Sequence, residues 1–454
     1  MIDMRRTALG FVGAIGAFLF LFSSQNVSAD SYTKEQLKGI VDKAMEMVRE
    51  DFLFYEEAKD AQCRREIADM IAMKLARETG TLRVALETAE DDEEENSANT
   101  EKVVCLDKHS QISTPRETED RKIKTSGVIA GIGVTVHEVN GRTVALDVIK
   151  ASPAENAGIL PGDVLLKARN EDESSFTDFK GIEDAVQKIR GPQNSTIYLV
   201  IERDGAVIEL PAFKRAIVEV PSVVMKEFDN VGYVAIKQFT KRTGYELGGA
   251  VVTLEEKGIK RLVFDLRDNP GGVVPGVIWA LYYWNTHIND IVITKRLRGG
   301  EEVYTIGNPF GSCPNLAPDT LCAAFFDSET GEVWLPGMFK NFRIVILINK
   351  MSASASEIFA GVMKDWGDVQ NKVILVGEPT YGKGVGQSIS MLPFGFSLAH
   401  TTFEYLVGNA KTKVNDIGVF PDYLLDDKRE SSEDTFGESD QQWRQALAIV
   451  REMQ

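Results

Sequence analysis

Apolar residues recur with helical spacing along the N-terminal third of the chain. The first stripe consists of Leu37, Ile40, Val41, Ala44, Met45 and Val48, and the second of Ile67, Met70, Ile71 and Leu75. Intervals of three and four residues place such side chains on one face of a helix. The pattern therefore predicts an N-terminal helical region over residues 30–123, interrupted by an acidic loop at Glu90–Glu95.

Over residues 124–214 the pattern changes to short alternating runs, which are typical of half-buried strands. These runs are Ile132–Val136, Val144–Ile149, Val164–Ala168 and Ile197–Ile201. Asp204-Gly205 predicts a hairpin turn before Val207–Leu210. One helix is expected at Lys180–Arg190. We expect a small, mostly β domain.

Over residues 215–425 apolar strands alternate with longer helical patterns. The strands are predicted at Val231–Ile236, Arg261–Leu266, Arg343–Ile348 and Val373–Val376. Such alternation is typical of an α/β domain, in which helices cover a mostly parallel sheet. The C-terminal tail, residues 426–454, ends in a predicted amphipathic helix at Gln441–Glu452.

The first 29 residues have the pattern of a targeting segment. Arg5 and Arg6 precede an apolar run at Ala8–Phe22, and Val27-Ser28-Ala29 supplies small residues before Asp30. The run is shorter than the roughly 20 residues that cross a membrane, which favours a cleaved signal peptide over a retained anchor. An exported protein is expected, in the periplasm or anchored to the membrane.

Composition excludes some functions and leaves others open. The chain has 454 residues and a net charge of −17, which argues against general binding to nucleic acid. Its four cysteines, Cys63, Cys105, Cys313 and Cys322, permit two disulfides in an exported chain. Cys313 and Cys322 bracket a short loop and are the better pair, which leaves Cys63 for Cys105. No motif indicates a metal or a cofactor.

A serine is the first candidate for chemistry. Ser354 lies between a predicted buried strand and a predicted helix, three residues before Glu357. This S-x-x-E spacing is common at helix starts, so a helix N-cap is the simpler interpretation. Unpaired backbone N–H groups at a helix start also favour developing negative charge. Ser354 can therefore serve as cap and as nucleophile.

A serine hydroxyl needs a base to remove its proton. No histidine has the setting of a catalytic base, and we expect each to be exposed or hydrogen-bonded: His109, His137, His287 and His400. Lys383 is the better candidate, because it lies between two glycines in a loop after a predicted strand. A surface lysine is the alternative. A phosphate-binding loop is poorly supported, since the P-loop spacing is missing.

A third segment, Arg261–Gly272, leads from a strand into a turn. Gly271 and Gly272 would let the backbone approach a ligand closely. An ordinary connection between strand and helix is the alternative.

These three segments resemble, in order and spacing, the signature blocks of C-terminal (tail-specific) processing peptidases. The family consists of Ser-Lys serine proteases with an α/β, crotonase-like (ClpP/crotonase-type) core and an inserted PDZ domain. Ser152–Asp163 is similar to the family's PDZ signature. Leu106–Ser110 and Thr125–Gly127 resemble the lead-in to that domain, and Gly418–Asp422 resembles the closing motif. The resemblance covers residues 105–425.

The resemblance implies a role for each matching residue. Ser354 would be the nucleophile, Lys383 the general base, and Gln387 the residue that positions this lysine. The oxyanion hole would use the backbone N–H of Ala355 and that of Gly271 or Gly272. The peptide-binding loop of the PDZ domain would be Gly131, Ile132, Gly133 and Val134.

The function implied is that of a serine endopeptidase that recognises the C-terminal tails of exported proteins and cleaves them through an acyl-enzyme. A catalytically silent PDZ scaffold or receptor is the main alternative. An enzyme acting on acyl thioesters and a cysteine protease using Cys313 are less well supported. An adaptor protein and a homo-oligomer are open as further partners.

Overall fold

The computed structural model describes most of the chain after the targeting segment. The described residues are 32–54, 60–79, 106–284, 287, 289–306, 325–326, 333–334, 337–368, 373–429, 435–437 and 439–453. The predicted signal peptide, the acidic loop and three cysteines (Cys105, Cys313 and Cys322) lie outside them. Among the described helices, none has the length and apolar character needed to span a bilayer.

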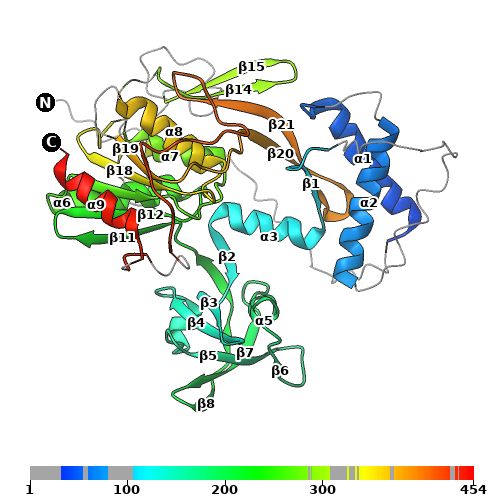
Figure 1. The fold of residues 1–454 in the computed structure, drawn as a ribbon. Coiled ribbons are helices and arrows are strands. Elements are labelled where there is room, and N and C mark those ends of the chain that lie inside the picture. Colours follow the sequence, from blue (N-terminus) through cyan, green and yellow to red (C-terminus); the bar gives the residue numbers. More distant parts are fainter. Residues whose placement is uncertain are drawn as a thin grey trace, which may run out of the picture.

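The N-terminal helical region contains α1 (Lys34–Asp51) and α2 (Asp60–Thr79). Both predicted apolar stripes are buried against one end of a long antiparallel arm, β20 (Val385–Met391) and β21 (Ser397–Val407). The short helix η4 (Pro393–Gly395) joins these strands. Figure 1 shows α1 and α2 at the far end of this arm, away from the main sheet. Cys63 on α2 is disulfide-bonded. Its partner lies outside the described residues, so the predicted pairing stays a prediction.

The mostly β region has the predicted strands. They are β3 (Val134–Val139), β4 (Arg142–Val148), β5 (Val164–Asn170), β6 (Thr177–Asp178), β7 (Thr196–Arg203), β8 (Ala206–Glu209) and β9 (Phe213–Lys214). The sheet has the order β3-β4-β5-β7-β8, which leaves β3 at an edge. Helices α4 (Pro153–Asn156) and α5 (Ile182–Ile189) complete the region. Asp204 and Gly205 both have positive φ, as the predicted hairpin turn requires.

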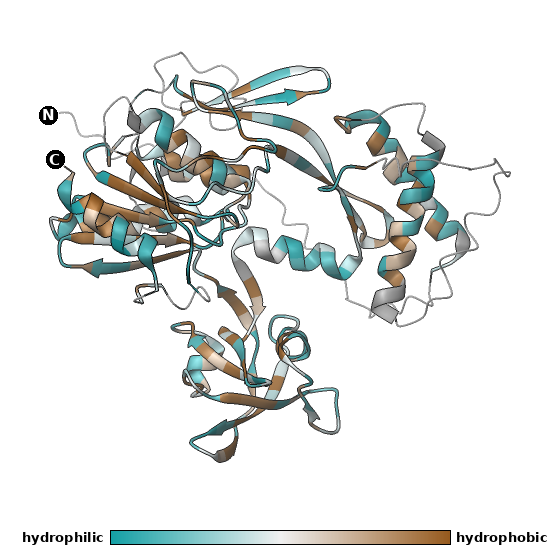
Figure 2. Ribbon diagram, viewed as in Figure 1, coloured by the Kyte–Doolittle hydropathy of each residue, from teal (hydrophilic) through white to brown (hydrophobic). Residues whose placement is uncertain are grey.

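Two strands connect this region to the rest of the molecule. β2 (Val128–Gly131) leads into it and β10 (Ala216–Glu219) leads out, and the two pair antiparallel. Helix α3 (Pro115–Ser126) precedes β2 and lies between the N-terminal helices and the core (Figure 1). Its surface is hydrophilic along most of its length (Figure 2).

The predicted α/β domain is built on a sheet with the order β11-β12-β13-β18-β19-β23. Its strands are β11 (Val223–Phe228), β12 (Val231–Ile236), β13 (Arg261–Asp265), β18 (Arg343–Ile348), β19 (Val373–Gly377) and β23 (Tyr423–Leu424). β11 is antiparallel to β12, and the remaining pairs are parallel. The prediction of a mostly parallel sheet is therefore confirmed.

Helices cover both faces of this sheet. Alternate side chains of its strands join separate apolar clusters, one with helices α6 (Thr243–Glu256), α7 (Val274–Tyr282) and α8 (Ala355–Asp368) and the other with α9 (Gln441–Glu452). All six residues of β12 are buried as a result. Helix α9 has the bounds predicted from the sequence.

A second, antiparallel sheet was not predicted. In it β21 pairs with β1 (Gln111–Ser113), β14 (Ile291–Leu297), β20 and β22 (Thr412–Lys413), and β14 pairs with β15 (Gly300–Thr305). A short pair, β16 (Phe325–Phe326) and β17 (Val333–Trp334), is separate from it. β21 thus connects the core to the N-terminal helices.

Candidate active site

The three segments singled out in the sequence meet at one edge of the main sheet. Gly271 and Gly272 follow β13, Ser354 follows β18, and Lys383 follows β19. These strands are parallel neighbours in the order β13-β18-β19, so the loops after their carboxyl ends lie side by side. The sheet therefore brings together residues that are more than a hundred positions apart in the chain.

Three serines alternate in the loop that begins α8, and their hydroxyls have different environments. Ser352 and Ser356 are fully buried. The Ser352 hydroxyl donates to Leu266 O (2.8 Å) and the Ser356 hydroxyl to Asn269 O (3.0 Å). The Ser354 hydroxyl forms no hydrogen bond with any described residue. Only this middle hydroxyl is available for chemistry.

The capping box expected at Ser354 is only half present. Its backbone N–H donates to Glu357 Oε2 (2.7 Å), as the motif requires. The Glu357 N–H, however, donates to the carbonyl of Ser354 (2.8 Å) and not to its hydroxyl. The φ of Ser354 is +56°, whereas an N-cap residue is usually extended. The simpler N-cap interpretation was thus wrong for the side chain.

Glu357 links the serine loop to the lysine loop. Its Oε1 accepts hydrogen bonds from the Thr380 hydroxyl (2.5 Å) and from Gly382 N–H (2.7 Å). Its Oε2 accepts from the N–H groups of Ser354 (2.7 Å) and Lys383 (2.8 Å). Because both N–H groups donate to the same oxygen, the backbone nitrogens of Ser354 and Lys383 are separated by no more than the sum of these two hydrogen-bond distances. Burial raises the pKa of Glu357, although all four hydrogen bonds act to lower it.

Tyr405 on β21 makes a second link between the two loops. Its hydroxyl lies within hydrogen-bonding distance of the carbonyl oxygens of Ser354 (3.3 Å) and Lys383. Tyr405 is almost fully buried, which raises the pKa of its phenol well above the usual value. The phenol stays protonated and can act as a donor.

Lys383 has an environment that disfavours its charge. Burial is the main cause that lowers its pKa, and the nearby cation of Arg121 acts in the same direction. The carboxylates of Asp107 and Glu357 oppose this shift but do not cancel it. The lowered pKa increases the fraction of neutral amine, the form that a base requires.

The Lys383 side chain is held by Gln387. Its Nζ donates to Gln387 Oε1 (3.1 Å), and Gln387 Nε2 donates in turn to the carbonyl of His109. Among the described residues, Lys383 Nζ forms no hydrogen bond to Ser354 Oγ. The structure therefore places the two residues on adjoining loops, with the amine directed to Gln387.

Two backbone N–H groups beside Ser354 have no partner in the described part of the chain, those of Gly272 and Ala355. The Gly271 N–H, by contrast, donates to Asn269 Oδ1 (2.9 Å). Gly271 acts through its small size, since a Cβ there would lie 2.8 Å from Ser354 Cβ and 2.9 Å from Ala355 N. Gly272 and Ala355 thus each present an unpaired backbone N–H group beside Ser354, and the oxyanion hole stays a prediction.

The turn that carries these glycines is held by the C-terminal tail. Asn349 Nδ2 donates to Asp268 (2.8 Å) and to Asp427 (3.0 Å). Arg429 forms ion pairs with the same two carboxylates, at 2.9 Å and 2.6 Å. Burial alone would raise the pKa of Asp427, but hydrogen bonds from Arg429 and Asn349 lower it to about 2. No sequence motif indicated this role for the tail.

Two of the histidines, His109 and His400, are partly or fully buried. The carbonyl of His109 supports Gln387, and burial and the charge of Lys383 lower the pKa of its imidazole. His400 is completely buried, which lowers the pKa of its imidazole, and a hydrogen bond with the backbone of Leu398 acts in the opposite direction. Of the two expected settings, the exposed one is excluded for His400, because β21 is covered where it passes the N-terminal helices.

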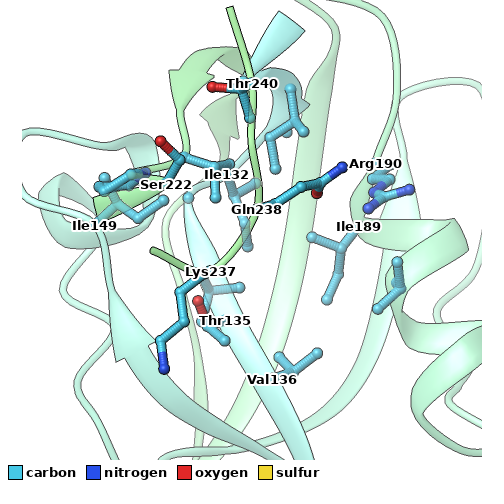
Figure 3. A pocket seen from close by; sticks show the side chains of 18 residues that line it. Ile132, Thr135, Val136, Ile149, Ile189, Arg190, Ser222, Lys237, Gln238 and Thr240 are labelled. Carbon is cyan, nitrogen blue, oxygen red and sulfur yellow. The ribbon is translucent and has the colours of Figure 1, made fainter. Parts of the chain in front are cut away.

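The predicted peptide-binding loop lines a cavity of about 380 Å³, which Figure 3 shows. The carbonyls of Ile132 and Gly133 accept hydrogen bonds from Ala154 N–H (2.7 Å) and Ile149 N–H (2.9 Å). The N–H groups of Ile132 and Gly133 have no partner in the part of the chain that the structure describes. The loop therefore offers free donors next to β3, an edge strand.

Comparisons with known proteins give one match for the α/β domain and one for the mostly β region. Residues 230–425 match the model of peptidase family S41, and residues 144–203 match a PDZ domain. A probable CtpA-like serine protease of Staphylococcus aureus (strain COL) is 30% identical over 320 residues, 70% of this chain and 57% of that protein. One from Staphylococcus saprophyticus is 30% identical over 323 residues, 71% of this chain and 58% of that protein. The chain thus spans less than two thirds of the length of these relatives.

Solved structures of lower identity are also similar. The photosystem II D1 C-terminal processing protease matches with a TM-score of 0.43 and 20% identity, over 88% of this chain and 96% of that one. The tricorn protease matches with a TM-score of 0.41 and 15% identity, over 92% of this chain and 37% of that one.

Proposed function

Because this chain contains a domain of peptidase family S41 and a PDZ domain, we propose that it is a serine endopeptidase that cleaves proteins selected by their C-terminal tails. The observation that carries the proposal is the free hydroxyl of Ser354 on a loop whose backbone shares the Glu357 carboxylate with the backbone of the half-buried Lys383. We further propose that the core is of the crotonase-like (ClpP/crotonase) type. The predicted domain limits, 30–123, 124–214, 215–425 and 426–454, are part of this proposal.

Ser354 and Lys383 would act as nucleophile and general base. The neutral amine takes the proton of the Ser354 hydroxyl as Oγ attacks the scissile carbonyl, and passes it to the leaving amine. Water then hydrolyses the acyl-enzyme. A free lysine has a pKa of about 10.4 and is almost entirely protonated near pH 7, so a lysine base needs a lowered pKa. The burial of Lys383 supports a shift in this direction.

The Lys383 amine would have to come within hydrogen-bonding distance of the Ser354 hydroxyl for this chemistry, since among the described residues it donates to Gln387 and forms no bond to that hydroxyl. The two loops are already fixed to each other through Glu357 and Tyr405. We propose that the lysine side chain, and not the loops, makes the adjustment that brings its amine to the Ser354 hydroxyl. Gln387 would hold the amine in the resting state.

The N–H groups of Gly272 and Ala355 would stabilise the oxyanion that forms on the scissile carbonyl. Each such donor contributes about 3–4 kcal/mol to transition-state stabilisation. Asn269 supports this arrangement, because its side chain engages the Gly271 N–H and the carbonyl of Ile236. The turn is thereby fixed before substrate binds.

Substrate tails would bind to the PDZ domain as an added strand along β3. The free N–H groups of Ile132 and Gly133 would hold the terminal carboxylate. The predicted targeting segment supports an exported enzyme, periplasmic or membrane-anchored, that acts on exported proteins. An adaptor protein and self-association stay predictions.

A fluorophosphonate probe tests the nucleophile in the purified full chain. The wild-type protein should be labelled and should degrade casein, whereas Ser354→Ala should do neither. Ser356→Ala is the matched control, because that hydroxyl is buried in a structural hydrogen bond, and it should keep the label. A silent PDZ scaffold would leave the wild-type chain unlabelled.

Lys383→Arg tests the base, since a guanidinium stays protonated. This variant should fold and lose casein degradation. Retained degradation would remove lysine from the role of base. Amidation of a substrate's C-terminus should slow its cleavage, and equal rates for both forms would contradict tail recognition.

A further inference from the structure

We propose that Lys237 of the peptidase core completes the tail-binding cavity and selects tails with an acidic side chain shortly before the terminal carboxylate. This inference rests on the proposed recognition of C-terminal tails. It adds a preference for one chemical class of tail and assigns it to a residue outside the PDZ domain.

The cavity is built from two parts of the chain. The PDZ side supplies the peptide-binding loop, β3 and the end of α5, whereas the core side supplies the segment 237–240 that follows β12. Figure 3 shows Lys237 and Gln238 entering beside residues of the PDZ side. A peptide lying along β3 would therefore contact the core as well as the PDZ domain.

The charges of the cavity favour an anion. Arg190 and Lys237 are its charged lining residues, and no carboxylate lines the described cavity. This differs from the chain as a whole, whose net charge is −17. Clustered charge of one sign in a concave site attracts ligands of the opposite sign. The lining of the cavity thus carries positive charge, in contrast to the negative net charge of the whole chain.

The two cations are not equivalent. Arg190 forms an ion pair with Asp120 of α3 at 3.2 Å. Lys237 forms no ion pair with any described residue, and its side chain is exposed to solvent in the open cavity. Lys237 therefore offers a charge that nothing in the described structure neutralises.

The position of Lys237 separates it from the terminal carboxylate. If the carboxylate binds at Ile132 and Gly133, which precede β3, the preceding residues of the tail must run antiparallel to β3 towards Val136. Figure 3 shows the Lys237 side chain directed along β3 beside Thr135, away from Ile132. Thr135 is two residues past Gly133, and strands advance about 3.3 Å per residue. Lys237 thus lies beside the second to fourth residues from the end of the tail.

The experiment measures binding by the full chain carrying Ser354→Ala, so that no peptide is consumed. Fluorescein-labelled decapeptides with an apolar last residue carry Asp, Asn or Lys at the second, third or fourth position from the end. Fluorescence anisotropy at low salt gives each Kd. At one of these positions Asp should bind at least about fivefold more tightly than Asn, and Lys more weakly than both. Added salt should reduce the difference.

Variants of Lys237 test the assignment. Lys237→Gln should remove the preference for Asp, and Lys237→Glu should reverse it in favour of Lys. Lys150→Glu is the matched control, because this exposed lysine follows Ile149 in sequence but does not line the cavity. It should keep the preference. Equal affinities for Asp, Asn and Lys tails, or an unchanged preference in both Lys237 variants, would overturn the inference.

Amidated peptides distinguish this failure from a failure of tail recognition. If amidation abolishes binding while Asp, Asn and Lys tails bind equally, tail recognition stands and the role of Lys237 is wrong. If Lys237 contacts only the terminal carboxylate, the Asp, Asn and Lys tails should also bind equally, and the proposed selectivity is wrong in that case too. If amidated and free peptides bind alike, tail recognition itself is wrong, and the inference is wrong with it.

Discussion

Replacing Glu357 by glutamine should uncouple the serine loop from the lysine loop without changing the size of the side chain. Each oxygen of the carboxylate accepts two hydrogen bonds. An amide keeps one oxygen and turns an NH2 group towards the other two donors. In either orientation of the amide, two buried donors lose their acceptor.

The expected magnitude follows from these two donors. A buried donor without a partner costs about 1–3 kcal/mol, so the loss of hydrogen bonding is about 2–6 kcal/mol. Burial raises the pKa of Glu357, so the wild-type carboxylate bears a desolvation cost that the neutral amide avoids. We therefore expect the lower end, about 2 kcal/mol. If the whole of this free energy is lost from the alignment of Ser354 with Lys383 in the transition state, kcat decreases about thirtyfold.

The assay is hydrolysis of an internally quenched peptide by the full chain at a temperature well below the unfolding transition. The Tm of each variant is measured in parallel. Asp163→Asn is the matched control, because this carboxyl is also buried and accepts a backbone N–H, from Leu160, but belongs to the PDZ region. It should lower Tm while leaving kcat within about twofold.

The reasoning fails on either of two results. If Glu357→Gln keeps kcat within threefold of the wild type, the carboxylate does not hold the two loops in register. If Asp163→Asn loses as much kcat as Glu357→Gln at a similar decrease in Tm, the effect is general destabilisation. Only a large loss of kcat with a folded protein supports the link.

Three further changes test the site. Gln387→Glu would place a carboxylate about 3.1 Å from Lys383 Nζ and raise the pKa of Lys383, so the acidic limb of the kcat/KM profile should move to higher pH; an unmoved limb would contradict the pairing. Lys383→Met should change the pH dependence of stability. Because burial lowers the pKa of Lys383 in the folded state, wild-type stability should rise relative to Lys383→Met as pH increases from that lowered pKa to about 10.4; parallel curves in urea unfolding would argue against burial. Gly272→Ala should abolish activity and lower Tm, because the added Cβ would lie 1.9 Å from Phe239 O and the backbone has a φ of +151°. The control Gly249→Ala adds a Cβ with no atom within 4 Å and should be neutral or slightly stabilising. Equal behaviour of the two variants would refute the steric argument.

The sequence predicted the elements whose pattern is local. The stripes of α1 and α2 and the bounds of α9 follow helical spacing, and the strands of the parallel sheet are continuous apolar runs because both faces are covered. The antiparallel arm was missed. Nearly all of β21 is buried, but different parts of the molecule cover its two ends, so its pattern has no single period.

The candidate site likewise has features that the sequence predicted and features that depend on the tertiary structure. The two glycines, Ser354 and Lys383 were found from motifs, because positive φ, close backbone approach and a nucleophile restrict the residue type at each position. The sequence could not show that Glu357 receives hydrogen bonds from both loops. In the sequence it was only a partner for a helix cap.

The sequence by itself determined which residues are proposed to carry the chemistry, and the order along the chain of the strands that precede them. Only the tertiary structure decided which groups are free to react. Among the described residues the Ser354 hydroxyl is unpaired while those of Ser352 and Ser356 are bonded, and Lys383 is half-buried, because distant segments of the chain surround these side chains. Hydrogen bonding and desolvation depend on neighbours in space, and a motif records only neighbours along the chain.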